Sequence, residues 1–363
     1  MVMSGKAHRV GVTGSESAYI EHHSGSSYQK DIQPIPNHPH AARLVLDALR
    51  ERGLEIDFIG HRFVHGGSCF QESTWLTPAV EPKIRACLPL ASLHNPNSWS
   101  VIETCRELLP GCRQYLTFDT AFHASLPPSA YTYPLPAQII RESGYRKYGF
   151  HGLSYQHVTH CVARALDRDL PDLNMIACHL GTGGSSAAAI RKGRSVDTTM
   201  GFTPLAGLMM STRTGDMDAL LVLRLLDDFS LTPLELDAVL NKKAGLLGVS
   251  GFSSDIRDIQ AAILEQADSK AKLAYAMYIR RLRETIASYA LLLGEVDALI
   301  FTDDIDARNA AVREAACQDL EWCGVCLDLD KNTLAEGGKL NRIDKAGSLV
   351  AIFCLPTDEE GVI

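Results

Sequence analysis

The chain has 363 residues, of which 46% are hydrophobic and 21% are charged, and its formal net charge is -8. A chain of this length can bury a large core and is expected to divide into two domains. The negative balance argues against a nucleic-acid binder, and no apolar run is long enough to span a membrane. The ten cysteines follow no regular spacing, which favours a reducing compartment and a cytoplasmic location.

Helical and strand-like patterns alternate along the chain. Apolar residues recur at helical spacing over residues 40–52, and that pattern ends near Gly53. Apolar runs of strand length lie at residues 56–64, 115–118, 175–180, 298–302 and 349–355. The longest predicted helix covers residues 270–293, where one face carries Tyr275, Ile279, Leu282, Ile286, Tyr289 and Leu293. This stripe belongs either to the core or to a dimer seam.

The alternation predicts an α/β fold in two domains. We place the first domain at residues 1–121, with residues 356–363 returning to it, and the second, nucleotide-side domain at residues 122–355. Polar or glycine-containing turns follow the predicted strands. Because ligand sites of open α/β sheets gather at the carboxyl ends of the strands, we expect the chemistry in these turns.

Residues 179–216 carry the residue types that phosphate binding needs. Gly181, Gly183 and Gly184 directly follow a predicted strand, where they can form a tight turn whose amides face an anion. Arg213 lies further along in a small-residue turn near Asp216. A fixed cation and a group of amides suit phosphoryl transfer, which depends mainly on positioning and charge neutralisation.

Three residues that precede this segment are further candidates for a functional site, and each also has a purely structural interpretation. Arg62 ends a predicted strand and can clamp a carboxylate or phosphate, although a surface salt bridge is the default for a lone arginine. Asp119 also follows a strand and can orient a substrate or an arginine, or else cap the next element. His151 can donate to developing negative charge, or make a structural hydrogen bond near a helix that begins around Ser154.

These segments resemble, in their order, the motifs of the acetate kinase family of short-chain carboxylate kinases. The resemblance runs from about Gly60 to Glu360 and includes HRFVHGG, LASLHNP, FDTAFH, YGFHG, HLGTGG, DTTMGFTPLAGL, STRTGD, GVSGFSSDIRDI and PTDEE. It implies the two-domain actin and sugar-kinase fold, which is ribonuclease H-like. It also implies phosphoryl transfer between ATP and a carboxylate such as acetate, with Mg²⁺ to neutralise the nucleotide, and we expect a homodimer.

The resemblance assigns a role to individual residues. Arg62 and Arg213 would hold the carboxylate and the transferring phosphoryl group, His151 would stabilise that group in flight, and Asp119 would orient the acceptor and the arginines. The lining of the acyl pocket would come from Val64, Leu93, Phe150 and Pro204. The nucleotide would contact His179, Gly181, Thr182, Gly183, Asp255, Ile256 and Arg257. Glu359 matches the magnesium-associated carboxylate.

The chain also departs from the family pattern. It joins that pattern after the family's first strand and serine-rich loop, so we expect the first domain to lack its first strand. Asp303, Asp304 and Asp306 stand where the family has a glycine-rich turn, and they bring like charge toward a polyphosphate. The alternative to an active kinase is therefore a degenerate, non-catalytic relative with a structural or regulatory role. The sequence does not rank acetate against propionate.

Overall fold

The computed structural model describes residues 3–12, 16–25, 27–92, 94–303 and 309–363. It consists of two compact units, Met1–Ala121 with Ile363, and Phe122–Val362. Both units combine strands and helices, which confirms the predicted α/β class. Within the described residues, no helix has both the length and the apolar character that crossing a bilayer would need.

The first unit contains two small sheets and three longer helical segments. Its strands are β1 (Ser4–His8), β2 (Tyr19–Ser24), β3 (Ser27–Ile32), β4 (Phe58–Phe63), β5 (Thr74–Trp75) and β6 (Arg113–Phe118). Its α-helices are α1 (His38–Glu51), α2 (Glu81–Ala86) and α3 (Asn95–Leu108). Strands β1, β2 and β3 pair antiparallel in that order. In the other sheet, of order β4-β6-β5, β4 and β6 are parallel, so their carboxyl ends lie side by side.

The core of the first unit forms under the β4-β6-β5 sheet. Phe63 and Phe118 end the two parallel strands, pair in register, and are almost completely buried. They belong to one apolar cluster with Phe70, Ile84, Cys87, Trp99, Ile102 and Leu116. Because these last residues of β4 and β6 are fixed in the core, the polar residues beside and after them are held in place.

The second unit is built on one mixed sheet. Its strands are β7 (Asn174–Gly181), β8 (Gly184–Arg191), β9 (Arg194–Thr198), β10 (Ala298–Thr302), β11 (Asn341–Arg342) and β12 (Ala351–Leu355). Among the described residues their order is β11-β12-β10-β7-β8-β9, with β10 parallel to both β7 and β12. The α-helices are α4 (Pro128–Tyr131), α5 (Ala137–Ser143), α6 (Gly152–Ala165), α7 (Ala219–Asp228), α8 (Pro233–Lys242), α9 (Gly245–Ser250), α10 (Ile256–Gln266), α11 (Ser269–Leu293), α12 (Ala310–Cys317) and α13 (Leu329–Leu334).

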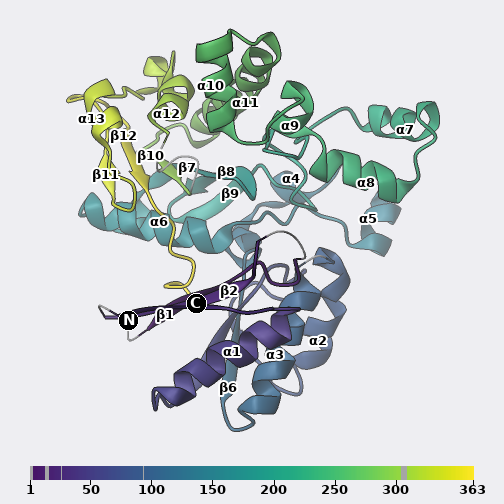
Figure 1. Ribbon diagram of the computed structural model, residues 1–363. Coiled ribbons are helices and arrows are strands. Elements are labelled where there is room, and N and C mark those ends of the chain that lie inside the picture. Colours follow the sequence, from purple (N-terminus) through teal and green to yellow (C-terminus); the bar gives the residue numbers. More distant parts are fainter. Residues whose placement is uncertain (1–2, 13–15, 26, 93, 304–308) are drawn as a thin grey trace. The chain divides into compact units, whose positions relative to one another are not determined.

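Helices cover both faces of this sheet (Figure 1). Side chains of β7 alternate between the faces, so Met175 and Ala177 join the cluster of α6, while Ile176 and Cys178 join the cluster of α11. By the same alternation His179 lies on the α6 face. The three-layer arrangement explains why β7 is apolar throughout rather than alternating.

Helix α11 settles the role of the predicted stripe. Asp268 caps its first turn by accepting a hydrogen bond from the backbone N–H of Ala271, and Gly294 follows its last residue. The residues Ile279, Leu282 and Ile286 are buried in the same cluster as the sheet. The stripe is therefore core rather than a dimer seam.

The β7–β8–β9 meander was not predicted beyond its first strand. Strand β8 has the sequence GSSAAAIR, and seven of its eight residues are buried. Small residues fit there because α11 contacts β8 closely. Serine and alanine carry little strand propensity, so neither composition nor periodicity marks this strand in the sequence.

Candidate active site

The first unit holds Arg62 and Asp119 together as a bidentate pair. The guanidinium Nε donates to Oδ1 of Asp119 at 2.9 Å, and Nη2 donates to Oδ2 at 2.7 Å. The Asp119 side chain is 2% exposed and that of Arg62 is 40% exposed. The carboxylate is therefore a buried anchor that presents the guanidinium to solvent. Arg62 thus forms a salt bridge, its structural alternative, but the carboxylate that it pairs with is buried rather than at the surface.

The segment after β4 is fixed by Asn95, the first residue of α3. The buried Asn95 accepts a hydrogen bond from the backbone N–H of His65 at 3.1 Å, and its amide donates to the carbonyl oxygens of His65 at 3.1 Å and Cys87 at 2.7 Å. Val64, predicted to line the acyl pocket, lies half-buried in this segment. Leu93, predicted for the same lining, lies outside the described residues.

In the second unit the predicted phosphate loop is the turn of the β7–β8 hairpin. Gly181 pairs with Gly184, and the exposed Thr182 and Gly183 connect them. The predicted tight turn after the strand is therefore present, and none of its three glycines adopts the positive φ seen at other glycines of the chain. A methyl group on Gly184 would lie 2.9 Å from Nη1 of Arg213, and one on Gly181 would lie 2.0 Å from Oδ2 of Asp303. A larger residue at either position would have to displace the end of one of these side chains.

Two histidines stack beside this hairpin. The rings of His151 and His179 are parallel within 26°, with centroids 4.0 Å apart. His151 immediately precedes α6 in the left-handed conformation, with φ 58°, and its Nδ1 is 2.8 Å from Oγ of Ser186 on β8. Ser186 is also 2.5 Å from the hydroxyl of Tyr155. Burial raises the pKa of Tyr155 well above its usual value, so the phenol stays protonated and remains a donor.

The hydrogen bonds of His179 define its tautomer. Its Nε2 lies 3.0 Å from Oδ2 of Asp303, and its Nδ1 lies 2.9 Å from Oγ of Ser154. An ionised carboxylate only accepts hydrogen bonds, so Nε2 carries the proton. In the neutral ring, Nδ1 then accepts from Ser154.

Arg213 is carried by a loop that closes on itself. The backbone N–H of Gly207 donates to Oδ1 of Asp216 at 2.8 Å, and the N–H of Asp216 donates to the carbonyl of Gly207 at 2.9 Å. The guanidinium is half-buried and donates to the carbonyl of Pro204 at 3.4 Å. Burial lowers the pKa of Arg213 from its usual value. Among the described residues, no carboxylate forms an ion pair with it, so its charge is available to an anionic ligand.

The remaining predicted residues also belong to the second unit. Asp255 caps α10, accepts from the N–H of Arg257 at 2.9 Å, and pairs with the Arg257 guanidinium, which lowers the pKa of Asp255. Ile256 is 2% exposed and belongs to the core cluster. Phe150 is buried, with its carbonyl oxygen 3.0 Å from Nε2 of His123. Glu359 lies half-buried in the segment after β12. Asp304 and Asp306 lie outside the described residues.

The donor set fits magnesium that arrives with a nucleotide. In the described part of the chain, no three His, Cys, Asp or Glu side chains gather as a metal cage. Mg²⁺ is commonly held by one or two carboxylates together with substrate phosphates and waters, so a dedicated cage is not required. A single carboxylate such as Glu359 suits that mode.

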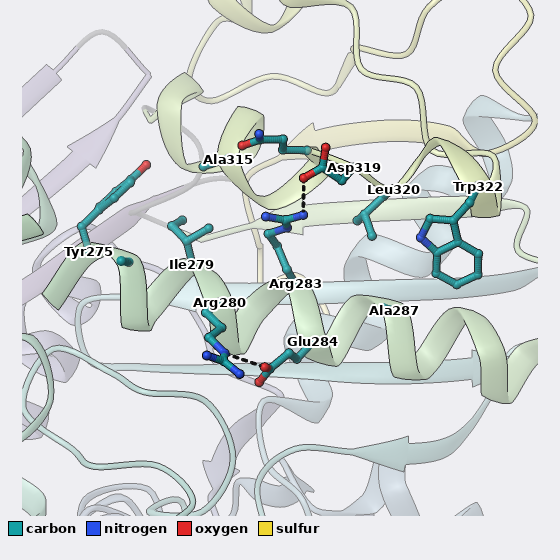
Figure 2. Close-up of a pocket in the computed structure, with 12 residues that line it drawn as sticks. Tyr275, Ile279, Arg280, Arg283, Glu284, Ala287, Ala315, Asp319, Leu320 and Trp322 are labelled. Atoms are coloured by element: carbon teal, nitrogen blue, oxygen red, sulfur yellow. Dashed lines mark hydrogen bonds and ion pairs between the residues drawn. The ribbon is translucent and has the colours of Figure 1, made fainter. Parts of the chain in front are cut away.

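A groove of about 670 Å³ on α11 is a different kind of site (Figure 2). Its lining includes the exposed Trp322, and both of its arginines are paired with carboxylates: Arg280 with Glu284 at 2.7 Å and Arg283 with Asp319 at 2.8 Å. No residue predicted for catalysis or binding lines it. Its arginines are neutralised, whereas Arg213 is not, so the groove is the weaker candidate for phosphate chemistry.

Several residues of the site carry no signal in the sequence. Ser154 and Ser186 fix the two histidines, and Asn95 fixes the loop after β4, but each is a common polar residue whose role depends on packing. Strand ends could have indicated Asp303, which directly follows β10, but it was interpreted only as unfavourable charge. That Asp303 would contact His179 on the neighbouring strand β7 is visible only in the folded sheet.

The site defines a class of protein and the comparisons define the family. In the second unit, stacked histidines and a glycine hairpin lie beside an arginine that has no carboxylate partner among the described residues, and such fixed donors and positive charge suit a phosphotransferase. The pattern of the acetokinase family matches residues 2–363, which extends the resemblance predicted from Gly60 almost to the start of the chain. The chain belongs to the acetokinase family.

Individual relatives agree with this assignment. Acetate kinase of Clostridium botulinum is 42% identical over 366 residues, covering 99% of this chain and 90% of that protein. The crystal structure of acetate kinase from Entamoeba histolytica is 40% identical with a TM-score of 0.91, covering 99% of this chain and 91% of that one. A propionate kinase structure from Francisella tularensis is 32% identical with a TM-score of 0.90 and the same coverage. The predicted family and fold are confirmed, and nothing in the comparisons supports the non-catalytic alternative.

Proposed function

We propose that this protein is an active carboxylate kinase that transfers a phosphoryl group between ATP and a short-chain carboxylate such as acetate, forming an acyl phosphate. The observation that carries the proposal is Arg213, a half-buried guanidinium that has no carboxylate partner among the described residues. A partly buried cation without a counter-ion is stabilised when an anionic ligand supplies the opposite charge. Family membership names the class of ligand, a phosphorylated carboxylate.

The first unit would bind and orient the acceptor. The fork of Arg62 suits a carboxylate or phosphoryl oxygen pair, and Asp119 holds the fork in one orientation. Holding the attacking oxygen in line is a large part of catalysis when little covalent chemistry is left to the protein. Val64, half-buried in the segment after β4, is proposed to line a small acyl pocket. Relatives named for acetate and for propionate are both similar to this chain, so we propose a short-chain acid without choosing between them.

The second unit would stabilise the charge of the transferring group. Tyr155 can donate to Ser186, and Ser186 to Nδ1 of His151, which places the proton of the neutral ring on Nε2, and His151 is proposed to stabilise the transferring phosphoryl group. Arg213 would neutralise the same group. The turn Gly181–Gly184 would take the nucleotide phosphates, with Asp255, Ile256 and Arg257 at the adenosine. Mg²⁺, associated with Glu359, would supply charge neutralisation on the nucleotide.

The test is to incubate the protein with acetate, ATP and magnesium, and to trap acyl phosphate with hydroxylamine. We expect the hydroxamate from the parent protein and a loss of about 100-fold or more in rate for Arg213→Ala, because a transition-state contact is removed. Arg280→Ala is the matched control, since Arg280 is an exposed arginine paired with Glu284 on α11. No hydroxamate from the parent, or equal rates for the parent and Arg213→Ala, would contradict the proposal.

We further propose a homodimer in the cytoplasm, with a first domain at residues 1–121, to which residues 356–363 return, and a second at residues 122–355. The support for a dimer is α7, in which no residue is buried although its sequence is ALLVLRLLDD. Leu220 is 70% exposed and Leu223 57% exposed, and an apolar helix of this kind on a monomer is typical of a contact surface. All ten cysteines are free thiols, which suits a reducing compartment.

A further inference from the structure

Asp303 lies directly against the turn proposed to hold the nucleotide phosphates. It follows β10, whose last residue, Thr302, pairs in register with His179 of β7. Its Oδ2 is 3.0 Å from Nε2 of His179. The same oxygen would lie 2.0 Å from a methyl group placed on Gly181. The carboxylate thus occupies the space above the backbone of Gly181.

The backbone at Asp303 adopts a conformation that favours glycine. Its φ is +80°, in the left-handed region that side chains with a Cβ rarely adopt. Aspartate tolerates this region better than most residues, but glycine adopts it without strain. A strained residue persists when its surroundings hold it in place, and such residues concentrate at functional sites. Here the contact between Oδ2 of Asp303 and Nε2 of His179 is one that holds the side chain.

The charges around the hairpin turn are of opposite sign on its two sides. Gly181 faces the carboxylate of Asp303, whereas its pairing partner Gly184 faces the guanidinium of Arg213. Both ring nitrogens of His179 have hydrogen-bonding partners, Nε2 with Asp303 and Nδ1 with Ser154. Its ring is also stacked on that of His151. A phosphate chain approaching the turn therefore meets a cation on one side and a fixed anion on the other.

We propose that Asp303 limits the affinity for the nucleotide: its carboxylate weakens the binding of nucleotide phosphates at the Gly181–Gly184 turn and engages the Nε2 of His179 that could otherwise contact them. This inference rests on the proposed function, because it takes the phosphates of ATP to lie at that turn. Repulsion between unit charges a few ångströms apart is large at the effective dielectric of a protein surface, and screening reduces it. Neutralising Asp303 should therefore tighten nucleotide binding without altering the acceptor side.

The experiment compares Asp303→Asn and Asp303→Gly with the parent protein. The asparagine keeps the size of the side chain and removes its charge, and the glycine also relieves the positive φ. We expect the KM for Mg-ATP to fall about tenfold in both variants, with the KM for acetate unchanged. Calorimetric titration with Mg-ATP in the absence of acetate should show the same tightening. Asp319→Asn, which removes one negative charge at the surface pair with Arg283, is the matched control and should change neither value.

The outcomes separate this proposal from that of the kinase itself. A KM for Mg-ATP that rises in Asp303→Asn would overturn it, because Asp303 would then assist the metal or the nucleotide. Unchanged nucleotide affinity in both variants would also overturn it. Absence of acyl phosphate from the parent would contradict the kinase, whereas tighter Mg-ATP binding by the variants in the calorimeter would still support the role of Asp303. Melting curves establish that each variant is folded.

Discussion

Asp119 shows how one buried carboxylate can set the chemistry of an exposed arginine. Two hydrogen bonds of 2.9 and 2.7 Å fix the plane of the Arg62 guanidinium. An arginine held in this way loses little side-chain freedom when a substrate docks, because its conformation is already restricted. The buried Asp119 thus acts by fixing the orientation of the exposed Arg62 guanidinium.

We expect Asp119→Asn to lower kcat/KM for acetate about 100-fold, because the guanidinium loses its charged anchor and its orientation. Stability should fall by about 1–3 kcal/mol, the usual cost of leaving a buried polar group poorly paired. Steady-state kinetics and urea unfolding measure the two effects.

Glu81→Gln is the control for this substitution. Glu81 also pairs with arginines of the first unit, Arg85 and Arg106, but these pairs lie at the surface. Its kinetics should match those of the parent. If Asp119→Asn retained full activity with acetate, the anchoring role of Asp119 would be wrong.

Single residues divide into those that the sequence reveals and those that it does not. Arg62, Asp119 and Arg213 could be chosen because charged residues at strand ends and in small-residue turns are few. The close contacts of Gly181 and Gly184 could not be predicted, because Asp303 and Arg213 approach these glycines only in the folded chain. The effect of Asp303 was predicted as general repulsion, whereas its contact with His179 required the pairing of β10 with β7.

At the scale of elements, β4 and β6 are joined by a buried side-chain contact in addition to their backbone ladder. His61 on β4 lies 2.8 Å from the carboxamide of Gln114 on β6. With its nitrogen toward His61, this carboxamide donates to Nε2 of the ring and to the carbonyl of Ile102, and accepts from the N–H of Arg106. Burial lowers the pKa of His61, so the ring stays neutral in the folded protein.

This pairing predicts acid sensitivity of the first unit. The folded protein binds a proton at His61 less readily than the unfolded chain does, so stability is complete above the ordinary histidine pKa near 6.5 and is lost as the pH falls below it. His22, whose pKa is also lowered by burial, acts in the same direction. Urea unfolding at pH 7.5, 6.5 and 5.5 measures the effect, taking these values as about one unit on either side of the ordinary pKa.

His61→Gln tests the assignment, since glutamine is neutral at every pH and can still bond the carboxamide of Gln114. Its unfolding free energy should depend less on pH over the same interval than that of the parent. An identical pH dependence in the two proteins would show that other groups are responsible.

Elements with a strong pattern were predicted closely. The strand at residues 298–302 coincides with β10, and the helix at residues 270–293 differs from α11 by one residue. These elements combine high apolar content with clear ends. Strand β8 lacks both signals, because its positions are filled by serine and alanine to fit against α11. The small sheet of β1, β2 and β3 was missed because its exposed strands are polar along most of their length.

At the scale of the whole molecule, the order of the motifs was more informative than any one of them. Each string is short and common, but together they predicted the family that the comparisons confirm. Periodicity alone could not show that the Arg62–Asp119 pair lies in one unit and the stacked His151 and His179 in the other. It depends on which strands pair, and pairing partners such as β7 and β10 are more than one hundred residues apart.

Association through α7 is a prediction at this scale. The double variant Leu220→Asp and Leu223→Asp should convert a dimer into a monomer, because two charges would replace apolar contacts. Sedimentation equilibrium gives the mass directly. Leu264→Asp on α10 is the control, since Leu264 is 86% exposed and should leave the mass unchanged. A monomeric parent, or a double variant that stays dimeric, would contradict the role of α7.

The short turn of the β7–β8 hairpin limits how much the backbone can change when a ligand binds. Its two eight-residue strands are paired up to Gly181 and Gly184, so only Thr182 and Gly183 lie outside the ladder. A turn this short has few alternative conformations to lose when an anion docks. The turn is therefore preorganised for its ligand. Amide hydrogen exchange in β7 and β8 should be slow both without and with the bound ligand.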